Sequence, residues 1–301
     1  MSEYIPLLTK IANLTMLAFM VSNMFAFGMR LSPGEIIAPL RDVRHNLKVF
    51  VANFVIVPAL AYALLHILHI EGQLAIGLLL LATAGGDPAV TKFSGLAKGD
   101  PAYALAVMMA LQIVSVFYMP IVLPPLLPGV HVDPLKIATP LVLFLLLPLV
   151  VGSLVRARWS GVAARLWKPF DTFSSFALVL VCALLFGLHF REMISQSLLV
   201  YTSLLIFIWI AFFAGYLLGA PGQIRQSDLA LNTSVRGVSA SLAVAITNFP
   251  GQGDIITIIL IYLAFLLATE APWCPTVLRR KNVAAAQARC GTTVVAERSP
   301  G

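Results

Sequence analysis

Long apolar stretches that follow one another along the whole chain limit what it can fold into. A helix needs about 20 apolar residues to cross the hydrocarbon core of a bilayer. Nine stretches reach that length, so the sequence predicts an all-α polytopic membrane protein. Their approximate ranges are 5–27, 45–68, 72–97, 101–126, 134–155, 171–190, 196–219, 227–248 and 254–274.

The composition agrees with a membrane protein. Of the 301 residues, 59% are hydrophobic and 11% are charged, whereas soluble domains carry about 25% charged residues. We expect one membrane transporter domain over residues 1–281 and a disordered cytoplasmic tail over residues 282–301, where the apolar density falls. The net charge of +7 does not indicate a nucleic-acid partner, because the basic residues fall in short loops. The lipid bilayer is the partner that this composition predicts.

Lysine and arginine are distributed unevenly between the predicted loops. Loops rich in them alternate with poor loops, as nine spans with an extracellular N-terminus and a cytoplasmic C-terminus require. We therefore expect a protein integral to the plasma (inner) membrane in that orientation. The basic residues of the rich segments are Arg30, Arg41, Arg44 and Lys48, then Arg156, Arg158, Arg165 and Lys168, then Arg279, Arg280 and Lys281.

Two of the nine stretches are interrupted. In 72–97 an apolar run ends at Gly85-Gly86-Asp87-Pro88, and Lys92 follows; 227–248 carries Arg236-Gly237 near its centre. Unwound backbone is tolerated inside a membrane only where it is buried in protein or lines a polar cavity. In transporters, such broken helices form the substrate and ion sites.

The interrupted stretches are the third and the eighth, five spans apart. This spacing fits a ten-span plan of two five-helix halves that lacks its first helix. Because five is odd, the halves would have opposite orientations. We therefore expect an inverted repeat whose two broken helices cross near the middle of the membrane.

Four stretches resemble the bile acid:sodium symporter family in order and spacing, over about residues 20–275. FGMRLSPGEI (Phe27–Ile36) resembles the family's FGMGL-x-L-x-P-x-(D/E)-(F/I) passage, and NFVIVP (Asn53–Pro58) resembles its QF-x-I-x-P helix start. GGDPAVTKFSGLAKGD (Gly85–Asp100) resembles the GGTASNVMTYLARGN signature. LNTSVRGVSASLAVA (Leu231–Ala245) resembles the TIEVGMQNSGLAAAL crossing helix.

The resemblance implies a core domain that holds the two broken helices and moves against a panel domain, giving alternating access. It implies organic-anion substrates such as bile acids, steroid sulfates or pantothenate-like acids, while a more remote branch exports arsenite. The regions that correspond to the family's sodium ligands supply our ion-binding candidates, which are Asn53, Thr91, Gln112 and Ser234.

This sequence departs from the family at those regions. Ser234 replaces the family's glutamate, and the cations Arg236 and Lys92 are added nearby. A site of this kind would repel a cation, so we expect sodium coupling through the family's ligands to be lost.

The charged residues at the breaks allow more than one interpretation. Arg236 is a ligand for an anionic substrate, a fixed cation that replaces sodium, or the ion-pair partner of Asp87. Asp87 is also a candidate proton carrier, and Lys92 either binds substrate or extends to the membrane interface. The substrate-binding candidates are Arg236, Asp87, Thr233, Ser234, Asn232, Ser239 and Lys92, and Asn23, Asn53 and Gln112 are further candidates to line the cavity.

We expect a secondary active transporter of a small organic anion and no enzyme activity. The sequence contains no HExxH motif, no Ser-His-Asp set and no paired carboxylates at one membrane depth. The alternative is a proton-coupled or uncoupled exporter or facilitator, such as a metalloid or organic-acid permease, although neither break holds a cysteine. We expect no cofactor other than Na+ or H+ as a coupling ion. We place Glu270 at the cytoplasmic interface, and the oligomeric state stays open.

Overall fold

The described part of the chain is helical. This computed structural model describes residues 5–30, 34, 43–127, 133–219 and 224–273. No β-strand occurs in these residues, as the apolar stretches predict. The tail expected over residues 282–301 lies outside them.

The described helices are named here in the order of the chain. In chain order they are α1 (Ile5–Arg30), α3 (Val43–Val51), the π-helical turn η1 (Ala52–Ile56), α4 (Val57–Ile67), α5 (Gly72–Thr83), α6 (Ala89–Leu96), α7 (Pro101–Leu126), α8 (Pro134–Leu141), the π-helical turn η2 (Val142–Leu146), α9 (Leu147–Arg158), α10 (Ser160–Ser195), α11 (Leu198–Leu218), α12 (Ile224–Ser234), α13 (Val238–Asn248) and α14 (Gly253–Trp273).

Eight helical segments in the described residues are long and apolar enough to cross a membrane. The third predicted span is not among them, because the five residues 84–88 between α5 and α6 are not helical; the eighth, with a shorter break between α12 and α13, is counted as one segment. Helix α5 alone is a shorter apolar helix. Eight membrane-length segments and one divided helix therefore account for the nine predicted spans.

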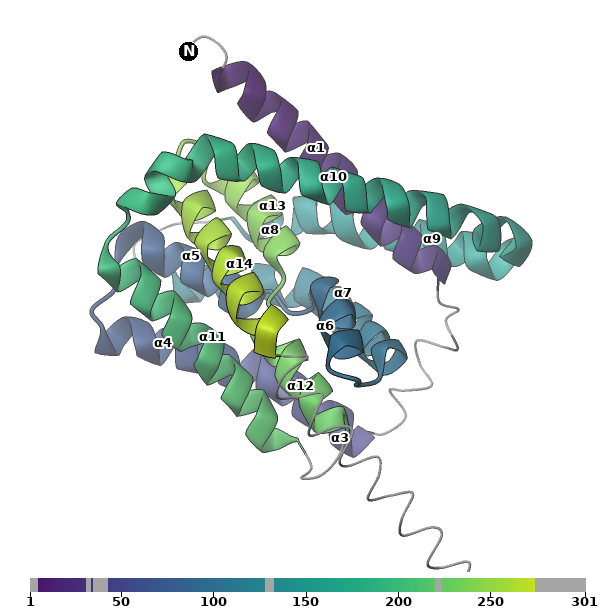
Figure 1. The fold of residues 1–301 in the computed structure, drawn as a ribbon, viewed down its shortest axis with the longest axis horizontal. Coiled ribbons are helices and arrows are strands. Elements are labelled where there is room, and N and C mark those ends of the chain that lie inside the picture. Colours follow the sequence, from purple (N-terminus) through teal and green to yellow (C-terminus); the bar gives the residue numbers. More distant parts are fainter. Residues whose placement is uncertain (1–4, 31–33, 35–42, 128–132, 220–223, 274–301) are drawn as a thin grey trace, which may run out of the picture.

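The helices form two groups. Helix α1 packs along α10 and against α9, and these three run across one side of the molecule (Figure 1). The broken pairs α5–α6 and α12–α13 belong to the second group, together with α14 and α11. The two groups correspond to the panel and core that the family resemblance implies.

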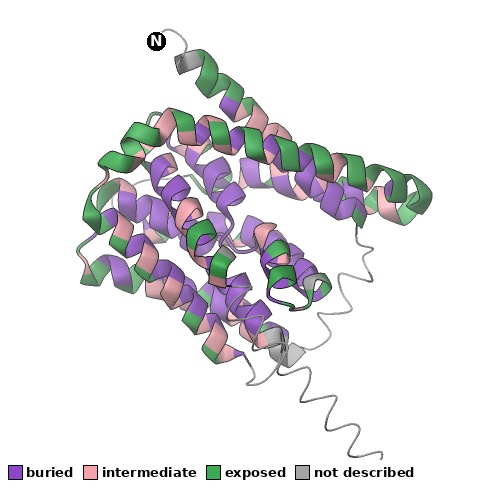
Figure 2. Cartoon of the chain, viewed as in Figure 1, coloured by how far each residue is buried: buried purple, intermediate pink, exposed green. Residues whose placement is uncertain are grey.

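Burial differs sharply between α10 of the first group and the α12–α13 pair of the second, as Figure 2 shows. In the stretch Gln226–Asn248, which contains both α12 and α13, 94% of the residues in an apolar 18-residue window are buried. The corresponding share in α10 is 22%. The second broken helix therefore lies at the centre of the protein. The exposed apolar side chains of α10 suit a surface that faces lipid.

The order of elements is repeated in the two halves. A long helix, then a second helix, then a broken helix and a final long helix occur as α1, α3–α4, α5–α6, α7 and again as α10, α11, α12–α13, α14. This order supports an internal repeat, and its inversion stays a prediction.

Candidate functional site

The two breaks contact each other directly. The first lies between the end of α5 at Thr83 and the start of α6 at Ala89, and the second lies between Ser234 and Val238. The backbone N–H of Gly237 donates a 3.0 Å hydrogen bond to the carbonyl oxygen of Ala84. The predicted crossing of two broken helices is therefore present.

A glycine lies in each break where the two breaks pack together. Gly86 has a φ of +81°, and a Cβ atom there would lie 2.5 Å from the carbonyl oxygen of Met108 on α7. At Gly237 a Cβ would lie 3.2 Å from Ala84 Cβ and 3.3 Å from the carbonyl oxygen of Gly86. At Gly86 only glycine permits the positive φ and the close approach together, whereas a Cβ at Gly237 would require its neighbours to shift by a few tenths of an ångström.

The unwound backbone of the first break receives a side-chain partner from α7. The Ser115 hydroxyl oxygen accepts a 2.8 Å hydrogen bond from Gly85 N–H and donates a 3.0 Å bond to the Gly85 carbonyl. A buried peptide group outside a helix needs such a partner. Sequence reasoning did not single out Ser115, which lies inside an otherwise apolar span.

The Asp87 carboxylate binds the N-terminal ends of two half-helices. Its Oδ1 accepts a 3.0 Å hydrogen bond from Ala89 N–H at the start of α6. Its Oδ2 accepts a 3.2 Å bond from Val238 N–H at the start of α13. A negative charge is stabilised at helix N-termini, where N–H groups lack intrahelical partners. Asp87 therefore occupies two N–H groups that could otherwise bind an anionic substrate at these helix ends.

Arg236 lies in the second break and is fully buried, with 0% of its surface exposed. Its Nε donates to the Leu81 carbonyl at 3.1 Å, and its Nη2 donates to the Ala82 carbonyl at 2.6 Å. These carbonyls lie in the last turn of α5, where a helix presents partial negative charge. Among the described residues no carboxylate contacts the guanidinium, so the considered ion pair with Asp87 is absent.

Asn53 supplies two more oxygens to the Arg236 guanidinium. Nη1 donates to the side-chain oxygen of Asn53, and Nη2 donates to its carbonyl oxygen at 3.3 Å. That carbonyl is free because η1 widens the helix there: Val57 N–H bonds to Ala52, and Pro58, the next possible donor, has no N–H. The proline and the π-helical turn together therefore present the Asn53 carbonyl to the arginine.

Tyr262 on α14 supports the second break. Its hydroxyl donates to the Ser234 carbonyl and accepts a 3.1 Å hydrogen bond from the backbone N–H of Arg236. The hydroxyl thus bridges the end of α12 and the break, and Tyr262 is itself fully buried. One tyrosine in a long apolar span gave no sequence signal for this role.

A cavity of about 580 Å³ lies between the two helix groups. From the crossing, Asp87, Thr91, Lys92 and Ser239 line it, and α1 contributes Asn23. The remaining lining is largely apolar, from residues of α1, α10 and α14. This volume falls within the range of about 300–1,000 Å³ typical of sites for small organic molecules.

Comparison with known proteins now identifies the family. The sequence profile of the SBF-like CPA transporter family matches residues 7–230. The chain belongs to this family. It is also 22% identical, over 232 residues, to the "uncharacterized sodium-dependent transporter YocS" of Bacillus subtilis (strain 168), and the match covers 74% of this chain and 71% of YocS. The resemblance to the bile acid:sodium symporter family is confirmed as that of a divergent member.

In this family member, the four ion-binding candidates have different hydrogen-bonding surroundings, and their role in ion binding stays a prediction. Asn53 contacts Arg236, whereas the Thr91 hydroxyl donates to the Pro88 carbonyl within its own helix at 2.9 Å. Gln112 is 1% exposed, and neither polar atom of its side chain has a hydrogen-bond partner in the described residues. The Ser234 hydroxyl lies 3.4 Å from the Leu231 carbonyl.

The substrate-binding candidates separate into two sets. Asp87, Lys92 and Ser239 line the cavity of this transporter, and the Ser239 hydroxyl has no hydrogen-bond partner in the described residues. The second set is packed inside the core, outside the cavity lining, and consists of Asn232, Thr233, Ser234 and Arg236.

The side chains of two members of the second set donate hydrogen bonds to backbone carbonyls of their own helix. The Asn232 side-chain nitrogen donates to the Asp228 carbonyl at 2.9 Å, and the Thr233 hydroxyl donates to the Leu229 carbonyl at 2.6 Å. Thr233 also packs on α11, where a Cβ on Gly215 would lie 2.4 Å from its hydroxyl oxygen. Serine, threonine and asparagine often bond to their own helix in this way.

Glu270 requires a correction. We expected it at the membrane interface, but it is 3% exposed and lies within hydrogen-bonding reach of Ser234. Its Oε2 has no hydrogen-bond partner in the described residues. Position near the end of an apolar stretch was misleading, because it does not show whether a side chain faces the membrane interface or the protein interior.

Proposed function

We propose that this transporter carries a small organic anion by alternating access and does not use sodium at the helix crossing. Membership of a transporter family establishes the general activity. The substrate class and the absence of sodium coupling are our proposals, and each is supported by a different feature of the described residues.

The observation that carries the proposal is the oxygen cluster around Arg236. In transporters with broken helices, unwound carbonyls and half-helix C-terminal ends coordinate sodium. Here the corresponding groups, the Leu81, Ala82 and Asn53 carbonyls, accept hydrogen bonds from the guanidinium. A tethered cation that occupies these oxygens supplies permanently the charge that a bound sodium ion would supply only when present.

This arrangement would separate the chain from its relative YocS, whose name describes it as sodium-dependent. An arginine cannot leave its site during a transport cycle as an ion does. Sodium would therefore contribute no driving force through the crossing.

The cavity supports an organic anion as the substrate. Lys92 and Arg30 contribute positive charge to a lining that is mainly apolar, and Asp171 contributes a negative charge. The charge of Asp87, by contrast, is engaged by two helix N-termini. An amphipathic acid could place its carboxylate near Lys92 and its apolar body against the Met and Phe side chains of α1.

Asn23 offers such a substrate an additional hydrogen bond. It is 4% exposed, and its side-chain nitrogen has no hydrogen-bond partner in the described residues. An amide N–H in this state donates readily to a carboxylate oxygen, since a buried unpaired donor is costly.

We further propose an extracellular N-terminus and a cytoplasmic C-terminus, from the alternation of basic loops. Arg30 and Leu96, the last residues of α1 and α6, both line the cavity. In the proposed orientation, these two helix ends face the cytoplasm.

The test is uptake of organic acids into proteoliposomes that contain the purified protein. Acids are first selected by their ability to raise its melting temperature. Uptake is then measured in sodium chloride and in choline chloride, and we expect equal initial rates. A rate that falls steeply when choline replaces sodium refutes the sodium-independent mechanism, and failure of every organic acid to bind refutes the substrate class.

Glu270 favours proton coupling as the source of the driving force. It is a buried carboxylate with one oxygen that lacks a hydrogen-bond partner in the described residues. A proton on that oxygen would remove the cost of a buried charge. An imposed pH gradient should accelerate uptake by the native protein and not by Glu270→Gln, whereas an equal response of both would exclude Glu270 as the proton site.

A further inference from the structure

Away from Arg30, the cavity lining reaches buried side chains. On α10 and α14 the last lining residues in that direction are Leu185 and Leu260, which are 4% and 1% exposed. One helical turn further along the same faces lie His189, four residues beyond Leu185, and Thr257, three residues before Leu260. Residues three or four apart share a helix face, so this pair lies directly beyond the closed end.

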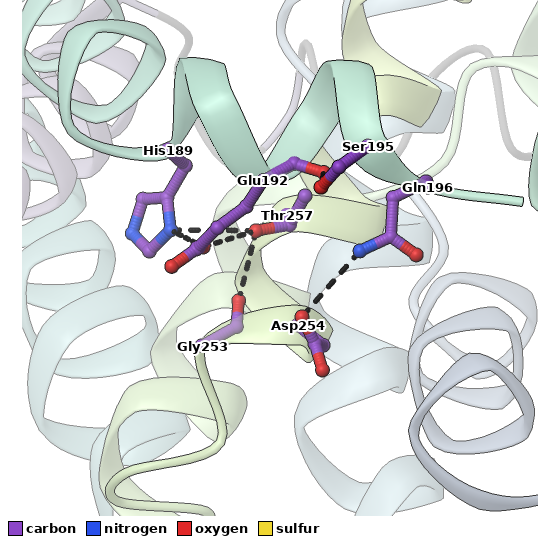
Figure 3. A network of polar contacts seen from close by, with 7 residues as sticks. All are labelled: His189, Glu192, Ser195, Gln196, Gly253, Asp254 and Thr257. Carbon is purple, nitrogen blue, oxygen red and sulfur yellow. Dashed lines mark hydrogen bonds and ion pairs between the residues drawn. The ribbon is translucent and has the colours of Figure 1, made fainter.

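A polar network joins the two helices at this level, as Figure 3 shows. His189 Nδ1 lies 2.6 Å from Glu192 Oε2, and the Thr257 hydroxyl on α14 donates to the same Oε2 at 3.0 Å. Nearby, the Gln196 side-chain nitrogen donates to Asp254 Oδ1 at 3.4 Å. The network therefore connects the panel helix α10 to the core helix α14.

The network is suited to opening and closing. The Glu192 side chain is 49% exposed, so water can replace its partners at little cost, and exposed pairs of this kind are weak. The Thr257 hydroxyl also lies 3.1 Å from the Gly253 carbonyl of its own helix. When α10 moves away, this carbonyl can accept the hydrogen bond from the Thr257 hydroxyl, and no buried donor is left unpaired.

We propose that His189, Glu192 and Thr257 form a latch that holds the cavity closed at this end and must open for alternating access. The proposal rests on the alternating-access part of the proposed function. It assigns the His189 end as a second, closed opening of the cavity. In the orientation proposed above, this end faces the extracellular side.

Cys182 provides a reporter for the opening. It lies on α10, lines the cavity and is a free thiol. A membrane-impermeant thiol reagent applied at the latch side can reach Cys182 only when the latch side is open. The full chain is used with Cys274→Ser and Cys290→Ser, so that Cys182 is the only cysteine, and labelling is measured in right-side-out and inside-out vesicles.

We expect slow labelling of the parent from the latch side and faster labelling from the Arg30 side. Glu192→Ala and Thr257→Val should each speed latch-side labelling about two- to five-fold, the range expected for loss of one exposed polar contact. The double variant should label no faster than the faster single variant, because both substitutions break the same contact.

Matched controls are Glu71→Ala and Thr202→Val. Glu71 is exposed and makes no capping hydrogen bond to the backbone of α5. The Thr202 hydroxyl bonds to carbonyls of its own helix α11. Both controls should label at the parent rate.

Unchanged labelling of the latch variants, or equal acceleration in the controls, overturns the latch. The assay needs no substrate and no coupling ion. A wrong substrate class would therefore leave its result intact, and confirmed organic-anion uptake with unchanged labelling would reject the latch alone.

Discussion

Arg236 and Ala82 belong to different broken helices, and Arg236 Nη2 donates a 2.6 Å hydrogen bond to the Ala82 carbonyl oxygen. This bond places a fixed positive charge at the carbonyl end of α5. The Asp87 carboxylate places a fixed negative charge at the N–H ends of α6 and α13. The backbone groups left without intrahelical partners at these half-helix ends are thus bound by charged side chains of the protein itself.

Substitution of Arg236 by Ala should destabilise the protein in a sodium-dependent manner. It leaves four buried oxygens, on Leu81, Ala82 and Asn53, without their donor, at a cost of at least about 3 kcal/mol. Sodium, which accepts such oxygens as ligands, should partly restore the melting temperature of the variant.

Melting of Arg236→Ala is compared in sodium chloride and choline chloride at equal ionic strength, with the native protein as the control. The native melting temperature should not depend on the cation. If the variant also melts at the same temperature in both salts, the oxygen cluster is not a vacated cation site.

Substitution of Asp87 by Ala should lower stability more than a comparable substitution at an ordinary helix cap. Asp87 caps two helices, whereas Asp133 accepts one backbone bond, from Leu135 at the start of α8. Each cap is worth about 1 kcal/mol, so the loss at Asp87 should be about twice that at Asp133. The apparent melting temperatures of Asp87→Ala and Asp133→Ala test this, and equal losses would contradict the shared cap.

Alanine at Gly86 should prevent the crossing from packing. The substitution combines a φ of +81° with a Cβ position 2.5 Å from the Met108 carbonyl. Gly72 provides a matched control, since its φ is +66° but a Cβ added there would have no atom within 4 Å. Gly72→Ala should cost about 1–2 kcal/mol from backbone strain alone.

Gly86→Ala should be more severe and yield little folded protein. Folded yield by size-exclusion chromatography and melting temperature distinguish the two variants. Similar folded yields and melting temperatures for both variants would show that α7 can shift to make room for the added methyl group.

Lys92 should contribute to substrate affinity. Lys92→Gln removes a positive charge from the cavity lining, so we expect KM for an organic acid to rise about ten-fold, the effect of about 1.4 kcal/mol. Lys98 lies on the same side of the break, is exposed and is not among the residues that line the cavity. Lys98→Gln should leave KM unchanged, and an equal rise in both variants would point to a general surface-charge effect.

The features that sequence alone could predict are those with a strong local cause. A membrane span requires about 20 apolar residues, and Gly85-Gly86-Asp87-Pro88 interrupts such a run visibly. The pairing of this break with Arg236-Gly237 followed from their positions and from the family resemblance. These predictions depended only on residue type and spacing.

Hydrogen-bond partners at the crossing could not be predicted in the same way. Apart from the Asn53 side-chain oxygen, Arg236 binds backbone carbonyl oxygens, which every residue carries, so residue type does not mark those partners. Sequence reasoning weighed Asp87 as the partner of Arg236. Asp87 instead binds backbone N–H groups, which nearly every residue has, so residue type does not mark them either. Thr233 looked like a ligand because it is polar, but its hydroxyl bonds to its own helix.

The sequence by itself determined the membrane-spanning helices, the two breaks and the charges placed within them, because apolar length and helix-breaking residues act locally. Only the tertiary structure decided what each charge contacts, which polar side chains reach the cavity and where the cavity closes. Those outcomes depend on which helix ends and carbonyl groups packing brings together from distant parts of the chain.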